Sequence, residues 1–81
     1  MNRPTLHQLT VFLAVATYGS YSTAARELNL AQSAVSFHVQ QLEDLVGTDL
    51  IEQLGKRLRL TPAGESVLLG ARQICHWLTL L

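Results

Sequence analysis

The chain has 81 residues, 48% of them hydrophobic, which is enough for one small domain with a core and excludes a disordered tail. Six Lys and Arg balance six Asp and Glu, so only the distribution of charge, not its total, can favour a polyanionic partner. The single cysteine, Cys75, excludes an internal disulfide and fits a cytoplasmic protein. We find no secretory signal and no run of about 18 apolar residues, so no membrane partner is expected.

The first predicted helix starts at a capping box, in which the Thr5 side chain caps the helix and Gln8 reaches back to the Thr5 backbone. Its apolar face recurs every three or four positions: Leu6, Leu9, Leu13 and Ala16, with Phe12 beside them. Gly19 is the expected C-terminal stop. This pattern predicts an amphipathic helix that packs on a core.

A second, short helix is predicted to start at Ser22 and to bury Ala24, Ala25 and Leu28. Asn29 can adopt the left-handed conformation of a tight turn. A third helix then runs over about residues 32–46 and ends at Gly47. Its predicted apolar face consists of Val35, Val39, Leu42 and Val46. A short helix, a tight turn and a second helix are typical of a helix-turn-helix, whose second helix enters a DNA major groove.

Two short extended runs, about residues 49–53 and 57–61, flank Leu54-Gly55-Lys56 and predict a β-hairpin. Arg57 and Arg59 would share one face of the second strand, with Leu58 and Leu60 on the other. The basic side chains of this segment favour contacts with phosphate. The alternative is that they only keep the hairpin edge soluble.

The last predicted helix begins at Thr61-Pro62, a cap followed by a proline in the first turn. Its apolar stripe consists of Val67, Ala71, Ile74, Leu78 and Leu81. A helix of about 20 residues extends about 30 Å, which is more than a small three-helix core can cover. We therefore predict that this stripe pairs with a second copy of the chain.

These elements predict a mainly α fold. Residues 1–61 form a winged helix-turn-helix, with a three-helix core and a β-hairpin wing over about 49–60. Residues 62–81 form a long linker and dimerisation helix.

From Ser20 to Glu65 the sequence resembles the N-terminal DNA-binding domain of LysR-type transcriptional regulators. The matching positions are Ser22, Ala24, Ala25, Leu28, Gln32, Ala34, Val35, Ser36, Leu42, Glu43, Gly47, Leu60, Thr61, Ala63 and Gly64. The resemblance implies a homodimer that binds a pseudo-palindromic operator in double-stranded DNA. Full members are several times longer, so it also implies that a small-molecule effector acts only through a C-terminal domain absent from these residues. The segment EQLGK, residues 52–56, is similar to the subgroup that regulates carbon-fixation operons.

The resemblance places family contacts at Gln32, Ser33, Ser36, Phe37 and Lys56. The full set of expected DNA-binding residues is Ser22, Arg26, Gln32, Ser33, Ser36, Phe37, Gln40, Lys56 and Arg57. Gln32 can pair with an adenine edge, and Phe37 can contact a thymine methyl or instead pack on a neighbouring side chain.

Five positions depart from the family pattern, among them Ser33, which replaces a common Pro, and Ile51, which stands where many members have Phe. Ala31 replaces a usual Ser, which weakens the helix cap, and Phe37 stands where Arg is common. Gln53 replaces an Arg, which removes an expected backbone contact.

Other functional classes find little support. The three histidines are far apart in sequence, so no metal site is expected, and no cofactor is implied. No Ser/His/Asp set or carboxylate pair is placed for catalysis, so the chain is not expected to be an enzyme, and the acids are interpreted as solvated charge. The alternative function is a winged-helix protein-interaction module that does not bind DNA, which the zero net charge allows.

Overall fold

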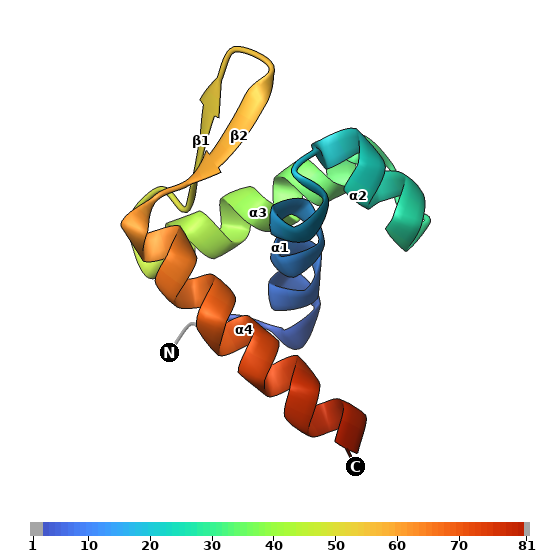
Figure 1. The fold of residues 1–81 in the computed structure, drawn as a ribbon, viewed down its shortest axis with the longest axis vertical. Coiled ribbons are helices and arrows are strands. Elements are labelled where there is room, and N and C mark those ends of the chain that lie inside the picture. Colours follow the sequence, from blue (N-terminus) through green and yellow to red (C-terminus); the bar gives the residue numbers. More distant parts are fainter. Residues whose placement is uncertain (1–2, 81) are drawn as a thin grey trace.

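The computed structural model describes residues 3–80, and the side chains of residues 3–78. The elements follow in the order α1 (Leu6–Tyr18), α2 (Tyr21–Leu28), α3 (Gln32–Val46), β1 (Ile51–Leu54), β2 (Arg57–Leu60) and α4 (Pro62–Leu80) (Figure 1). This arrangement confirms the predicted mainly α winged helix-turn-helix, with the hairpin wing projecting from one end of the helical core.

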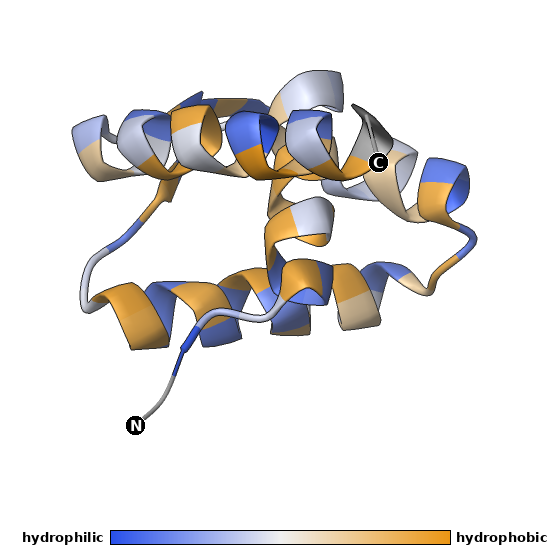
Figure 2. Cartoon of the chain, turned by 90° about the horizontal axis from the view of Figure 1, so that it is seen from below, coloured by the Kyte–Doolittle hydropathy of each residue, from blue (hydrophilic) through white to orange (hydrophobic). Residues whose placement is uncertain are grey.

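The core lies where α1 meets the other three helices. One cluster joins Val11 and Val15 of α1 to Ala25 of α2 and Val35 and Val39 of α3. A second cluster centres on the fully buried Phe12, Leu42 and Leu50 and reaches the first turns of α4. In Figure 2, α3 and α4 lie on opposite sides of α1, and the hydrophobic residues of α4 gather on the side that faces it.

The capping box at Thr5 is confirmed, since the Gln8 N–H donates to Thr5 Oγ1 and the Thr5 N–H donates to Gln8 Oε1, each at 3.0 Å. The predicted apolar face of α1 is wrong in part. The buried residues are Gln8, Val11, Phe12, Ala14 and Val15. Leu6 is exposed. Because α1 is apolar on most sides and touches three helices, periodicity alone did not identify its buried stripe.

Helix α2 begins one residue earlier than predicted. Its N-cap is Ser20, whose hydroxyl accepts the Thr23 N–H at 3.1 Å. The extended backbone of Ser20 (φ −160°, ψ 132°) directs its hydroxyl at the first turn. Asn29 adopts the predicted left-handed conformation, with φ 57°.

Helix α3 has the predicted bounds and ends at Gly47, whose φ is 86°. Its N-cap, Ala31, forms no side-chain cap, as the missing hydroxyl predicts. Val46 is exposed and not part of the buried face, because the last turn of α3 runs past the core.

The wing is an antiparallel pair with Ile51 opposite Leu60 and Leu54 opposite Arg57. The predicted alternation in β2 is confirmed: Arg57 and Arg59 are exposed, whereas Leu58 and Leu60 are half-buried. The strands are shorter than predicted, four residues each, and at the base of the hairpin the fully buried Leu50 still accepts the Thr61 N–H through its carbonyl.

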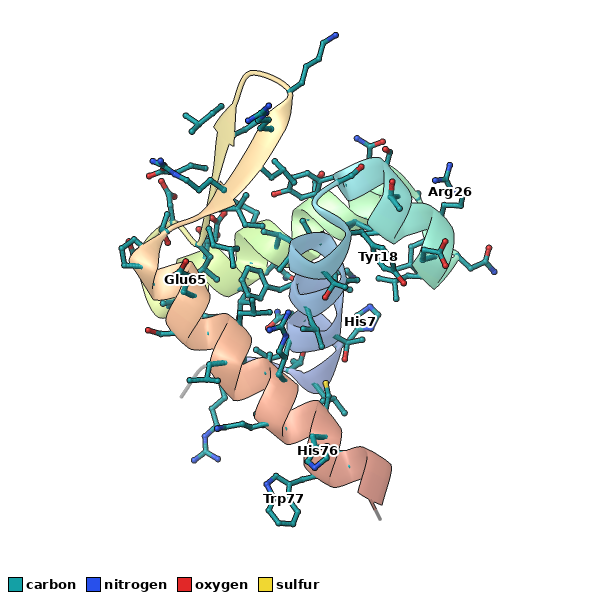
Figure 3. All side chains as sticks on the ribbon, in the orientation of Figure 1. His7, Tyr18, Arg26, Glu65, His76 and Trp77 are labelled. Atoms are coloured by element: carbon teal, nitrogen blue, oxygen red, sulfur yellow. The ribbon has the colours of Figure 1, made fainter. Side chains whose placement is uncertain are left out.

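Helix α4 begins at Pro62, where the Thr61 hydroxyl accepts the Gly64 N–H at 3.0 Å. The prediction for Ala71 is corrected: it is 1% exposed and packs inside its own chain, so it cannot form part of an outer stripe. Val67 is half-buried against the second cluster. Ile74 and Leu78 are exposed, as the stripe requires, together with Trp77 (Figure 3). Leu81 lies outside the described residues.

Candidate nucleic-acid interface

A groove of about 420 Å³ lies between the start of α2, the outer face of α3 and the wing. Five of the predicted DNA-binding residues line it together: Ser22, Gln32, Ser36, Gln40 and Lys56. They come from three elements that are separated in sequence, so the groove is a product of the fold. Its walls also include Tyr21, Glu43 and Gln53, which the sequence did not single out as contacts.

The other four predicted contacts lie outside this groove. Ser33 and Phe37 are exposed on α3, and Arg57 is exposed on the wing. Arg26 points away from α2 into solvent in Figure 3. A long DNA duplex extends beyond one groove, so these positions can meet neighbouring phosphates but are not gathered by the structure.

The helix starts add positive potential to the same face. Gly19, Ser20, Tyr21 and Ser22, at the beginning of α2, all line the groove. Because the first N–H groups of a helix have no intrahelical acceptor, such a terminus can bind a phosphate oxygen. At α3 the uncapped Ala31 leaves the first-turn N–H groups without a side-chain acceptor. Anion binding at this face therefore does not need a basic recognition helix.

Phe37 is 59% exposed, and its ring meets the ring of His38 edge to face at a centroid distance of 5.8 Å. The observed neighbour is thus a residue of α3, and most of the Phe37 ring remains open. His38 in turn meets His7 of α1, with centroids 4.5 Å apart and planes at 88°. The sequence places these two histidines 31 positions apart and gave no signal for their contact.

This histidine pair does not extend into a metal-binding cluster. Over the described part of the chain, no three His, Cys, Asp or Glu side chains gather in a way that could hold a metal ion. The buried Nδ1 of His38 has no hydrogen-bond partner among these residues.

Two glutamines on α3 are already engaged. Gln40 donates one amide N–H to the Asp44 carboxylate at 3.0 Å, which leaves its second N–H and its carbonyl oxygen available. Gln41 is half-buried and accepts from Gln8 at 3.4 Å. Gln32 is exposed at the start of α3. Of these three amides, Gln32 is the one best placed to read a base edge with both of its polar groups.

The wing separates its basic residues into two classes. Arg59 forms an ion pair with Glu52 at 2.9 Å. Within residues 3–78, Lys56 and Arg57 form no ion pair. Lys56 and Arg57 are therefore the basic residues of the wing that can contact phosphate directly.

Glu43 corrects the expectation that all acids are solvated charge. Its Oε2 accepts the N–H groups of Leu50 at 2.8 Å and Ile51 at 3.3 Å. Nearby, burial and then the negative charge of Glu43 raise the pKa of the Tyr21 phenol above its ordinary value of 10.0. The sequence gives little signal that Glu43 accepts these two N–H groups, since it shows only an acid directly after the buried Leu42.

Comparison with known proteins gives a consistent result. The family model for bacterial regulatory helix-turn-helix proteins of the lysR family matches residues 6–65. The chain is 54% identical over 69 residues to the RuBisCO operon transcriptional regulator of Allochromatium vinosum. The matched residues cover 85% of this chain and 23% of that relative. The chain thus spans less than a quarter of the relative's length.

Two solved structures of protein–DNA complexes have the same fold. The protein in the CbnR_DBD–DNA complex is similar with a TM-score of 0.86 and 33% identity, over 93% of this chain and 86% of that one. The protein in the BenM_DBD/catB site 1 DNA complex is similar with a TM-score of 0.89 and 29% identity, over 93% and 83%. No helix in the described residues is long and apolar enough to span a membrane.

Proposed function

Because the chain belongs to the lysR family of bacterial regulatory helix-turn-helix proteins, we propose that it is the sequence-specific DNA-binding domain of a dimeric transcriptional regulator that acts in the bacterial cytoplasm. In this proposal residues 1–61 bind DNA and residues 62–81 form the linker and dimerisation helix. The observation that carries it is the groove in which α2, α3 and the wing present Ser22, Gln32, Ser36, Gln40 and Lys56 to one ligand.

The recognition helix α3 enters the major groove, which is wide enough for an α-helix. Gln32 to Val46 contains no Lys or Arg, so this helix reads base edges with uncharged groups. Gln32 offers a donor and an acceptor to adenine, and the exposed Phe37 ring offers an apolar surface to a thymine methyl. Attraction to phosphate comes from Lys56, Arg57 and the helix starts.

The dimer forms through the half of α4 that extends beyond the core. Ile74, Trp77 and Leu78 are exposed there, and a second copy would cover them. Two recognition helices then meet half-sites about 34–36 Å apart, or a multiple of that spacing, in a pseudo-palindromic operator. A small-molecule effector acts through another part of the full regulator, which the much greater length of the relative supports.

The similarity to a RuBisCO operon regulator supports an operator at a carbon-fixation operon. The test compares binding to duplexes from such promoters with binding to unrelated palindromes of equal length and composition. Equal affinity for both sets would contradict this part of the proposal and leave general DNA binding intact.

Fluorescence anisotropy with labelled duplexes at several salt concentrations tests the main proposal. We expect binding to a palindromic, A/T-centred duplex that weakens steeply as salt rises, because phosphate contacts release counterions. Gln32→Ala and Ser36→Ala should reduce base preference, by about 1–3 kcal/mol where a bidentate contact is lost, whereas Lys56→Ala should weaken all duplexes alike. Absence of binding at low salt would favour the alternative, a winged-helix module that binds protein.

A further inference from the structure

The base of the wing is held by a chain of hydrogen bonds that links three elements. Glu43 of α3 accepts the N–H groups of Leu50 and Ile51 through one carboxylate oxygen, at 2.8 and 3.3 Å. The Leu50 carbonyl then accepts the Thr61 N–H at 3.0 Å, just before α4. The Thr61 hydroxyl donates to the Asp49 carbonyl at 2.7 Å. The Glu43 side chain therefore connects the recognition helix to the base of the wing by hydrogen bonds.

The wing depends on this attachment more than a larger sheet would. It has only two strands of four residues each, and an isolated two-stranded hairpin is marginally stable in water. Its outer half, including Gln53, Leu54 and Lys56, is exposed. The orientation of that half against α3 is therefore set at the base, where Ile51 and Leu58 pack on the core.

Glu43 also lies in the wall of the groove, together with Lys56 of the wing and Ser36 of α3. A carboxylate in a surface that faces DNA repels phosphate and is costly unless it has another task. Accepting two backbone N–H groups is such a task, because a charged acceptor forms hydrogen bonds about twice as strong as a neutral one. The groove thus contains an acid whose hydrogen bonds point to the wing backbone and not to a ligand.

We propose that Glu43 is a positioning residue that fixes the wing against the recognition helix and so determines how Lys56 contributes to DNA binding. The inference rests on the proposed function for its DNA readout. It assigns Glu43 a role through the wing, not a contact with a base or a phosphate.

A double-mutant cycle on the 81-residue chain tests this role. In the wild type, Lys56→Ala should weaken all duplexes alike and lower the salt slope by about one. In a Glu43→Ala background the same substitution should have little further effect, because the untethered wing no longer holds Lys56 at the duplex. The preference of α3 for operator over scrambled DNA should remain. A Lys56→Ala effect that is unchanged in the Glu43→Ala background would overturn the proposal.

Two variants separate the hydrogen bonds of Glu43 from its charge. Glu43→Gln removes the charge but keeps an oxygen that can accept both N–H groups, so it should restore the full Lys56→Ala effect. Asp44→Ala removes a neighbouring carboxylate that bonds Gln40 and not the wing, so it should leave that effect intact. If the Lys56→Ala effect is also lost in Glu43→Gln or in Asp44→Ala, its loss in Glu43→Ala comes from the change in charge or from damage to α3, and not from the lost hydrogen bonds.

Amide hydrogen exchange gives a readout that does not need DNA. The Leu50 and Ile51 amides should exchange faster in Glu43→Ala but stay protected in Glu43→Gln and Asp44→Ala. If the wild type binds no duplex, the proposed function fails while this measurement still tests the tether. If Glu43→Ala does not fold, Glu43→Asp, with a side chain one methylene shorter, takes its place. Unchanged protection of both amides in a folded Glu43→Ala or Glu43→Asp chain would overturn the tether itself.

Discussion

Gly64 at the start of α4 packs directly on the backbone of Leu50, so a Cβ at residue 64 would overlap the Leu50 carbonyl oxygen. The same carbonyl accepts the Thr61 N–H at 3.0 Å. Two backbones thus meet without a side chain between them. This contact allows the start of α4 to pack closely against Leu50, the residue just before β1. In the sequence, nothing distinguishes Gly64 from the other glycines as a packing position.

Gly64→Ala should destabilise the chain by about 2–3 kcal/mol, because the obstructing atom belongs to backbone that cannot move aside cheaply. Denaturant unfolding followed by circular dichroism measures this change. Gly70→Ala in the same helix is the control, since nothing lies within 4 Å of its added Cβ. It should stabilise by about 0.5–1 kcal/mol through helix propensity. A neutral Gly64→Ala would contradict the close approach.

Ala31→Ser should stabilise the chain by about 1 kcal/mol, because a hydroxyl at the uncapped N-cap of α3 can accept the N–H of Ser33 or Ala34. For a domain of this size the melting temperature should rise by roughly 4–8 °C. Ala31→Val supplies no acceptor and should give no such gain. An equal rise in both variants would attribute the effect to something other than capping.

The free energy of unfolding should fall at alkaline pH, and Tyr21 should account for part of the fall. Burial, and then the charge of Glu43, raises the pKa of the Tyr21 phenol above 10.0 in the folded state. The folded chain therefore holds this proton more tightly than the unfolded chain does. Its contribution is fully present below about pH 10 and is lost as pH rises through the raised pKa.

Tyr21→Phe should flatten the stability profile above about pH 10, measured by urea unfolding at a series of pH values. Tyr18→Phe serves as the control, because the Tyr18 side chain is exposed, and it should keep the wild-type slope. A Tyr21→Phe profile as steep as that of the wild type would refute the assignment.

Glu52→Gln should raise affinity for every duplex and steepen the salt slope by up to about one, because it releases Arg59 from its ion pair. The cost in stability should be small, since an exposed ion pair contributes at most about 1 kcal/mol. Glu27→Gln makes the same change in net charge on α2, away from the wing, and should have a weaker effect. Equal gains in both variants would mean that net charge alone is responsible.

Ile74→Glu should convert a dimer of the chain to a monomer of 8.9 kDa in sedimentation equilibrium, because a carboxylate cannot be buried unpaired between two helices. His76→Glu adds the same charge to an exposed position outside the predicted stripe and should leave the mass of the dimer unchanged. A dimer that survives Ile74→Glu would move the interface to another surface.

The order of elements could be predicted from the sequence, because it depends on local signals. Thr5, Gln8, Asn29 and Gly47 mark helix ends by chemistry that acts over a few residues, and each does so in the structure. Gln32 to Val46 was predicted with its observed bounds for the same reason. The resemblance to LysR-type domains, confirmed by the family match, added the functional meaning of these elements.

Only the tertiary structure decided which apolar and charged residues face inward. Leu6 and Val46 fit their helix periods but stay exposed, while Ala71 turns into its own core. Glu43 reaches the backbone of Leu50 seven positions away, and His7 meets His38. Such pairings depend on where separate elements come to lie, which a period within one element does not encode. The sequence by itself therefore determined the helices, the turns and the family, whereas packing between elements decided the core, the tether of the wing and the groove.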